Sequence, residues 1–177
     1  LSALRTDATL FTRAYTHVPL TLPAHASLFT GLLPARHGVH DNLGYRIDPK
    51  APTLAELLRG AGYATGGAVS AVVLEGATGI SRGFDFWDDE IAPTKAYQAL
   101  NRVQRLGDET REALEGWITR QGEKPFLAFL HLYEPHSPWE PPEPFRGRYA
   151  DPYDGEVAAA DAVVGRFVAF LKARGIY

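Results

Sequence analysis

The sequence contains no cysteine and no methionine among its 177 residues. Without cysteine, the chain has no disulfide, no thiolate metal site and no cysteine nucleophile. It also lacks any run approaching the ~20 consecutive apolar residues of a membrane-spanning helix, so we expect no membrane segment within this chain. With 18 basic against 21 acidic residues, the charge balance gives no electrostatic reason to expect nucleic acid as a partner.

The two ends of the sequence indicate part of a longer polypeptide. The chain starts at Leu1, contains no Met, and stops at Tyr177 directly after an expected helix end. We therefore expect residues 1–177 to form one partial domain. The compartment stays unknown, with the bacterial cytoplasm and the cell envelope both open, because a leader upstream of Leu1 would not be visible.

Helix signals are clear in the first third of the chain. Residues up to about Ala14 resemble the tail of an amphipathic helix. After Thr21, apolar residues at helical spacing predict a helix of about ten residues that ends at Gly31. Thr53 is followed three residues later by Glu56, the pattern of a capping box that starts another helix.

Two apolar segments predict strands. Residues 63–74 are consistent with a buried strand, and residues 76–90 are expected to be loop. Residues 125–133 are almost continuously apolar, as in a central parallel strand covered on both faces. Helices are expected after Asp108, as an N-cap, and up to Gly175. This order predicts an α/β fold with a mainly parallel sheet flanked by helices.

Thr21 is the first candidate for chemistry. Free N–H groups and the helix dipole favour negative charge at a helix start, and Pro23 belongs in its first turn. A hydroxyl there is still a weak nucleophile without a base or a metal. His25, one turn later, lies on the same face and could orient an oxyanion. The alternative is that Thr21 is only an N-cap, contributing ~1 kcal/mol.

Two weaker metal hypotheses stay open at this point. The first is a transition-metal site on the loops around the Thr21 helix, built from His17, His37, His40, Asp41 and Asn42. The second is calcium at the acidic stretch 85–90, which lacks the alternating spacing of a calcium loop and is more typical of a solvated turn.

A longer pattern carries a family resemblance. The stretch "TLPAHASLFTGLLPARHGVHDN" resembles the signature of the sulfatase family in the alkaline phosphatase superfamily. The resemblance continues in "PTLAELLRGAGYATGGAVSA", "SRGFDFWDDE", "PFLAFLHLYEPHSPWEPPEPF" and "YDGEVAAADAVVGRF". It covers nearly the whole chain in the family's order and implies an alkaline-phosphatase/sulfatase-like fold, incomplete in this excerpt.

The resemblance implies roles for individual residues. Thr21 stands where sulfatases carry the Cys or Ser that becomes formylglycine. Because Thr cannot make that aldehyde, no formylglycine is expected, and Thr21 looks like the unmodified nucleophile of phosphate-handling relatives. His25 replaces the family's usual Arg. His136 matches the family's substrate-binding His.

Two further positions receive weaker assignments from the resemblance. Ser70 falls in the stretch where the family carries its Lys and His contacts to the transferred group. His131 is either an anion ligand or a buried His satisfied by backbone. The family's divalent metal would bind Thr21, with its remaining ligands outside this chain. The ion would be calcium if the protein is sulfatase-like, or manganese, magnesium or zinc if it is phosphoesterase-like.

The resemblance thus predicts a metal-dependent hydrolase of a small-molecule, glycan or lipid ester. Given Thr21, we expect a phosphate-type ester in preference to a sulfate-type one, cleaved through a covalent intermediate. The excerpt alone is expected to be inactive. Two alternatives stay open: a phospho-alcohol transferase of the same superfamily, and a sulfatase-like protein that only binds its ligand.

Overall fold

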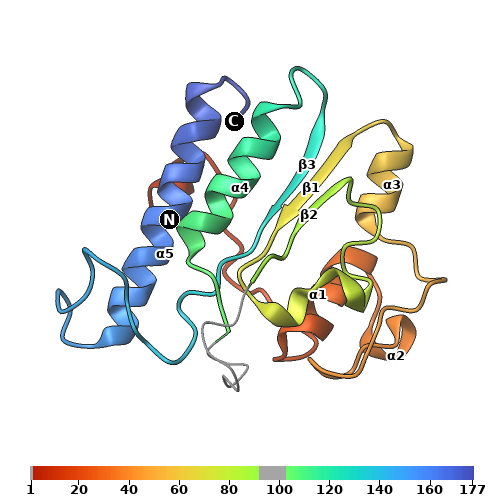
Figure 1. Cartoon of the computed structure of the whole chain (residues 1–177), viewed down its shortest axis with the longest axis horizontal. Helices are drawn as coiled ribbons and strands as arrows, with labels where there is room; N and C mark the ends of the chain where they lie inside the picture. Colours follow the sequence, from red (N-terminus) through yellow and green to blue (C-terminus); the bar gives the residue numbers. More distant parts are fainter. Residues whose placement is uncertain (1, 92–102) are drawn as a thin grey trace.

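A parallel sheet of three strands forms the centre of the computed structural model, which describes residues 2–91 and 103–177. The strand order is β2-β1-β3. The strands are β1 (Ala64–Ala68), β2 (Phe86–Asp88) and β3 (Phe126–Leu130). The α-helices are α1 (Thr21–Thr30), α2 (Pro34–His37), α3 (Leu54–Gly60), α4 (Gly107–Thr119) and α5 (Pro152–Ala173). Figure 1 shows α4 and α5 on one side of the sheet and α1 and α3 on the other.

The central strand β1 has two glycines because aromatic rings lie against both of its faces. A Cβ atom on Gly66 would lie 2.5 Å from the ring of Trp117 in α4. A Cβ atom on Gly67 would lie 2.5 Å from the ring of Trp87 in β2. Since side chains alternate between the faces of a strand, the missing side chains let both layers pack closely onto β1.

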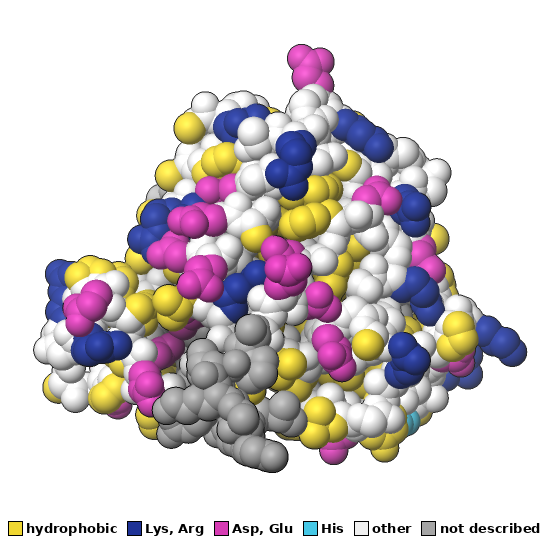
Figure 2. All heavy atoms as spheres, viewed as in Figure 1, with side chains coloured by type: hydrophobic (Ala, Val, Ile, Leu, Met, Phe, Trp, Pro, Cys, Tyr) yellow, Lys and Arg dark blue, Asp and Glu magenta, His cyan; other side chains and the backbone are white. Residues whose placement is uncertain are grey.

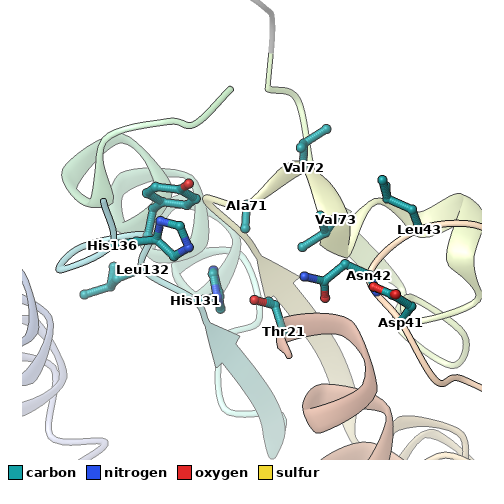
Figure 3. Close-up of a pocket in the computed structure, with 11 residues that line it drawn as sticks. Thr21, Asp41, Asn42, Leu43, Ala71, Val72, Val73, His131, Leu132 and His136 are labelled. Carbon is teal, nitrogen blue, oxygen red and sulfur yellow. The ribbon is translucent and has the colours of Figure 1, made fainter. Parts of the chain in front are cut away.

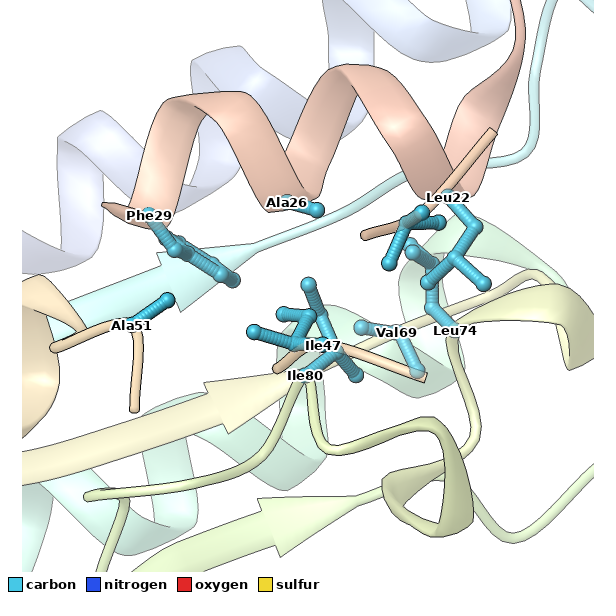
Figure 4. Close-up of a cluster of buried hydrophobic side chains, with 9 residues drawn as sticks. Leu22, Ala26, Phe29, Ile47, Ala51, Val69, Leu74 and Ile80 are labelled. Carbon is cyan, nitrogen blue, oxygen red and sulfur yellow. The ribbon is translucent and has the colours of Figure 1, made fainter. Parts of the chain in front are cut away.

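Two clusters of buried side chains hold the layers together. On one face, α1 contributes Leu22, Ala26 and Phe29, which pack with residues of the following loops and Val69 (Figure 4). On the other face, α4 contributes Leu114, Trp117 and Ile118. We find no helix in the described residues that is long and apolar enough to cross a membrane.

Several element predictions are confirmed and others are wrong. The α1 helix ends at Gly31 in the left-handed conformation, and the capping box of Thr53 and Glu56 is present. In place of a helix reaching Ala14, the structure has a short 3-10 helix at Ser2–Thr6. Residues 5–17 are exposed, so no buried apolar face stabilises a longer helix there.

The strand predictions also need correction. The strand β2 lies in the segment that was expected to be loop. The strand β3 is parallel as expected, yet it is an edge strand of the described sheet and not a central one. Asp108 is not an N-cap, since the cap position of α4 is Leu106. The first N–H of α4, on Gly107, donates instead to Glu134, and Asp108 pairs with Arg166.

Charged side chains of both signs are interspersed over the face seen in Figure 2. Many form pairs, such as Arg59 with Asp85 and Arg105 with Asp88. The described residues of this face therefore form no continuous basic surface of the kind that binds a nucleic acid backbone.

Candidate active site

A pocket of about 340 Å³ lies beyond the carboxyl ends of β1 and β3, at the start of α1 (Figure 3). This is the edge of a parallel sheet at which α/β folds bind ligands. The side chains that line it come from four segments. They are Thr21, Asp41, Asn42, Leu43, Ala71, Val72, Val73, His131, Leu132, Tyr133 and His136.

Thr21 is the first residue of α1 and not its cap. The cap position is Leu20, and no side chain of the helix itself caps its start. The backbone N–H of Leu22 donates instead to Oδ1 of Asn42, at 2.9 Å. The prediction of Thr21 as an N-cap is therefore wrong. Asn42, from another loop, caps the helix, and Thr21 lines the pocket.

Asn42 is the main site residue that sequence reasoning missed, having been considered only as part of a metal cluster. Its Oδ1 is held by Leu22, so its Nδ2 keeps two N–H donors for another partner. Figure 3 shows this nitrogen on the side of the Thr21 hydroxyl. The neighbouring Asp41 accepts the Asn42 backbone N–H at 2.6 Å, which fixes the loop. The site thus has a donor placed beside the candidate nucleophile.

His131 extends from the end of β3 into the same pocket. Burial, with a smaller contribution from His25, lowers the pKa of His131 to about 3. Its Nδ1 is buried and has no hydrogen-bond partner among the described residues. Backbone therefore does not satisfy this nitrogen. A neutral imidazole faces the pocket with one nitrogen unsatisfied.

His25 lies behind His131 and does not line the pocket. Its Nδ1 is 2.7 Å from the backbone oxygen of Thr21. Since a carbonyl only accepts, Nδ1 carries the proton. Burial lowers the pKa of His25, so the ring is neutral and its single N–H is already used. Its ring meets that of His131 edge to face, with centroids 5.1 Å apart. This geometry does not support the expected role of His25 as an oxyanion donor and makes it a support for Thr21 and His131.

His136, which the resemblance predicts to be a substrate contact, lines the pocket from the segment after β3. Its Nδ1 lies 2.6 Å from the carbonyl oxygen of Ser137 and therefore carries a proton, which leaves Nε2 for a ligand. The ring of Tyr133 packs on it, with centroids 4.5 Å apart. Burial raises the pKa of Tyr133, so its phenol stays protonated. Tyr133 was not predicted, because it lay within an expected apolar strand.

Ser70 is not part of the pocket, and the expectation of a substrate contact there is wrong. Its side chain is fully buried, and its Oγ lies 2.6 Å from Oγ1 of Thr110 in α4. Arg105 donates to the same Thr110 oxygen. The next residue, Ala71, does line the pocket. Because successive side chains of an extended chain point to opposite faces, Ser70 points to α4.

The two alternative metal sites do not form. Among the described residues there is no group of three His, Asp or Glu side chains able to hold a metal ion. His37 is buried, with Nε2 3.0 Å from Ser27 Oγ. In the acidic stretch, Asp88 pairs with Arg105, and Asp89 accepts the N–H of Gly76.

The divalent metal implied by the resemblance also lacks a donor set here. Asp41 is the single carboxylate among the residues that line the pocket of the described chain. Hydroxyl, amide and one carboxylate fall short of the oxygen ligands that calcium or magnesium takes. We therefore derive no chemical step through a metal ion.

Lowering the pH from 6.5 toward 3 is expected to destabilise the wild type more than a His131→Gln variant. In this range the unfolded chain binds a proton at His131 that the folded chain does not, because the folded pKa is about 3. The free energy of unfolding should therefore fall by about 1.4 kcal/mol per pH unit from this residue alone. Urea unfolding at pH 7, 5.5 and 4.5 measures the difference, since the other titrating groups are common to both proteins. Equal pH slopes in the two proteins would show that His131 is not held neutral.

Comparison with known proteins agrees with the geometry. The model of the sulfatase family matches residues 1–177. N-acetylgalactosamine-6-sulfatase from Sus scrofa is 27% identical over 226 aligned residues, which cover 97% of this chain and 41% of that protein. The chain thus spans less than half the length of this relative.

Solved structures show the same fold at lower identity. The phosphonate monoester hydrolase of Agrobacterium radiobacter superposes with a TM-score of 0.75 at 20% identity, covering 98% of this chain and 54% of that one. Ps i-CgsB in complex with k-i-k-neocarrahexaose superposes with a TM-score of 0.72 at 20% identity, covering 92% and 47%. The expected sulfatase-like α/β fold is confirmed, and the match over the full sequence shows that the chain belongs to the sulfatase family.

Proposed function

We propose that this chain carries the nucleophile of a hydrolase that cleaves a singly charged phosphate-type ester. The observation that carries the proposal is the start of α1. Its backbone is capped by Asn42 from another loop, and the Thr21 hydroxyl lines a pocket with the Asn42 amide beside it. The remaining backbone donors and the dipole of this helix end favour negative charge at the same place.

The proposed reaction has two steps at phosphorus. The Thr21 Oγ attacks the phosphorus, a Thr21–phosphorus ester bond forms, and the bond to the leaving oxygen breaks. Nε2 of His136, which can accept because Nδ1 carries the ring proton, takes the proton from the attacking Thr21 hydroxyl and passes it to the leaving oxygen, and the Asn42 amide donates to the phosphoryl oxygen that gains charge. Water then hydrolyses the phospho-threonine and restores the hydroxyl. We assign His131 to the transferred group, which would satisfy its unpartnered nitrogen.

The charge of the pocket favours a singly charged ester. None of the residues that line it is Lys or Arg, and one, Asp41, is acidic. A phosphomonoester dianion would lose its hydration against neutral donors and one negative side chain, which is costly. A phosphodiester or a phosphonate monoester has a single charge. The phosphonate monoester hydrolase named above supports this class. A sugar-containing ester is supported by the sulfatase and the carrahexaose complex named above.

The test compares three aryl esters on the full-length protein: bis(4-nitrophenyl) phosphate, 4-nitrophenyl phosphate and 4-nitrophenyl sulfate. We expect the highest kcat/KM for the diester. The variant Asn42→Asp keeps an acceptor for the Leu22 N–H but replaces the amide donor with a negative charge. It should lose about 100-fold or more in diester turnover, the usual cost of removing one oxyanion donor.

Stability is the control for this variant. A carboxylate at a helix start is as good a cap as an amide, so the unfolding midpoint of Asn42→Asp should match the wild type. Fastest turnover of the sulfate ester would overturn the substrate class. Wild-type diester turnover in Asn42→Asp would overturn the oxyanion role.

A further inference from the structure

A second hollow, of about 440 Å³, lies outside the site described above, between the segment that follows β3 and the start of α5. The lobe at the lower left of Figure 2, which corresponds to this segment in Figure 1, shows hydrophobic, basic and acidic side chains together. The residues that line the hollow include Trp139, Glu140, Pro141, Arg146, Tyr149 and Asp151.

Aromatic rings are half exposed at this hollow. Trp139 is 49% exposed and Tyr149 is 40% exposed. Trp139 is held edge to face by Tyr153, with ring centroids 5.9 Å apart and planes at 77°. A half-exposed tryptophan held by such a ring contact presents apolar surface at low entropic cost. Leaving such a ring in water is unfavourable, and a ligand that covers it would gain that area.

The backbone of the hollow is anchored to α5. The side chain of Glu156, which is 5% exposed, accepts the backbone N–H of Glu140 at 3.0 Å. Pro141 packs so closely on Gly155 that a Cβ atom there would lie 2.9 Å from the proline ring. Asp151 caps α5 by accepting the N–H of Tyr153 at 2.9 Å. These contacts fix both walls of the hollow to one helix.

The polar groups at the rim select the chemical class of ligand. Arg146 is exposed and forms no ion pair with a described residue, so its five N–H donors are available. Asp151 and Glu140 supply acceptors on the same rim. A cation would be repelled by Arg146, and an anion by the two carboxylates. A purely apolar ligand would bury the Arg146 guanidinium without offering it a partner, at high cost.

We propose that this hollow binds a neutral sugar ring. A sugar has an apolar face of C–H groups that can cover Trp139, and hydroxyls that both donate and accept at its rim. As a subsite for the non-reacting part of the substrate, this assignment rests on the proposed function. His136 lines the active-site pocket and Trp139 the hollow, and their Cα atoms lie at most about 11 Å apart along the chain. One sugar-containing ester can therefore contact both.

Calorimetric titration of the full-length protein with maltohexaose, cellohexaose and chitohexaose tests the assignment. We expect at least one of these neutral oligosaccharides to bind with a Kd below 10 mM, on the order of the weakest useful affinities. Trp139→Ala should weaken that binding about tenfold. Arg146→Ala should also weaken it, whereas Arg148→Ala should not. Arg148 is the matched control because it is an exposed arginine two residues away that does not line the hollow.

The outcomes separate this proposal from the proposed function. If none of the three probes binds, or if Trp139→Ala and Arg146→Ala bind like the wild type, the sugar site is wrong, whatever the turnover of aryl esters. If a probe binds in a Trp139-dependent way while the protein cleaves no aryl phosphodiester, the sugar site stands and the hydrolase proposal fails. A Thr21→Ala variant should bind the oligosaccharide with wild-type affinity, because Thr21 does not line the hollow.

Discussion

Thr21→Ala is expected to reduce kcat for the phosphodiester by roughly a thousandfold or more, the scale seen when a covalent nucleophile is removed. No other lining residue can replace it. The one further hydroxyl at the pocket of the described chain belongs to Tyr133, whose raised pKa makes it a poorer nucleophile at neutral pH. Steady-state turnover of bis(4-nitrophenyl) phosphate by the full-length protein measures the effect.

The matched control for this variant is Thr21→Ser, which keeps a hydroxyl at the same place. It should retain most of the activity, and both variants should unfold near the wild-type midpoint, because Thr21 does not cap α1. Mass spectrometry of acid-quenched reactions should find a 4-nitrophenylphosphoryl group, left after loss of one nitrophenol, on the Thr21 peptide of the wild type and none in Thr21→Ala. Turnover by Thr21→Ala within tenfold of the wild type would remove Thr21 from the mechanism.

The parts of this site that were predicted from sequence are local ones. The start and end of α1 follow from residues within ten positions of each other, and so does the capping box at Thr53. Asn42 was not recognised because its partner, Leu22, is 20 residues away in sequence. The sequence around a loop asparagine does not indicate which distant backbone N–H its side chain will accept.

The direction in which a side chain points is the second feature of the site that could not be predicted from the sequence. Ser70 and Ala71 are neighbours in an extended segment, and one position decides whether a side chain reaches α4 or the pocket. An assignment by sequence resemblance placed the contact on Ser70. The same limit applies to His25. It shares a helix face with Thr21, as expected, but its ring nitrogen bonds to the backbone oxygen of Thr21 and does not approach the Thr21 hydroxyl from the pocket.

The strand β2 was missed because it has three residues and its stability comes from packing. Trp87 stacks on Phe129 of β3 with ring planes at 2°, and Phe86 stacks on Trp117 of α4. A segment of three residues is too short to show the alternation of apolar and polar residues that indicates a strand, so neither contact could be predicted. Gly83, three residues before β2, lies so close to the start of α3 that the chain leading into β2 has no room for a side chain there.

Gly83→Ala is expected to destabilise the fold by roughly 3 kcal/mol or more, and two effects combine in it. Gly83 has φ of 89°, in the left-handed region that costs an alanine about 1–2 kcal/mol. An added Cβ would also lie 2.7 Å from the carbonyl carbon of Ala55 and closer still to the backbone nitrogen of Glu56. Backbone at the start of α3 cannot move aside as a flexible side chain would.

Gly62→Ala separates the two effects, because Gly62 has nearly the same φ, 91°, and nothing within 4 Å of its Cβ position. It should cost only the backbone term, about 1–2 kcal/mol. Urea unfolding followed by tryptophan fluorescence measures both variants. A larger loss in Gly83→Ala than in Gly62→Ala is the signature of the clash with α3, whereas equal losses would mean that the lead-in to β2 does not pack on α3 as described. In that case the alignment of β2 beside β1, and with it the shape of the sheet edge that carries the pocket, would need revision.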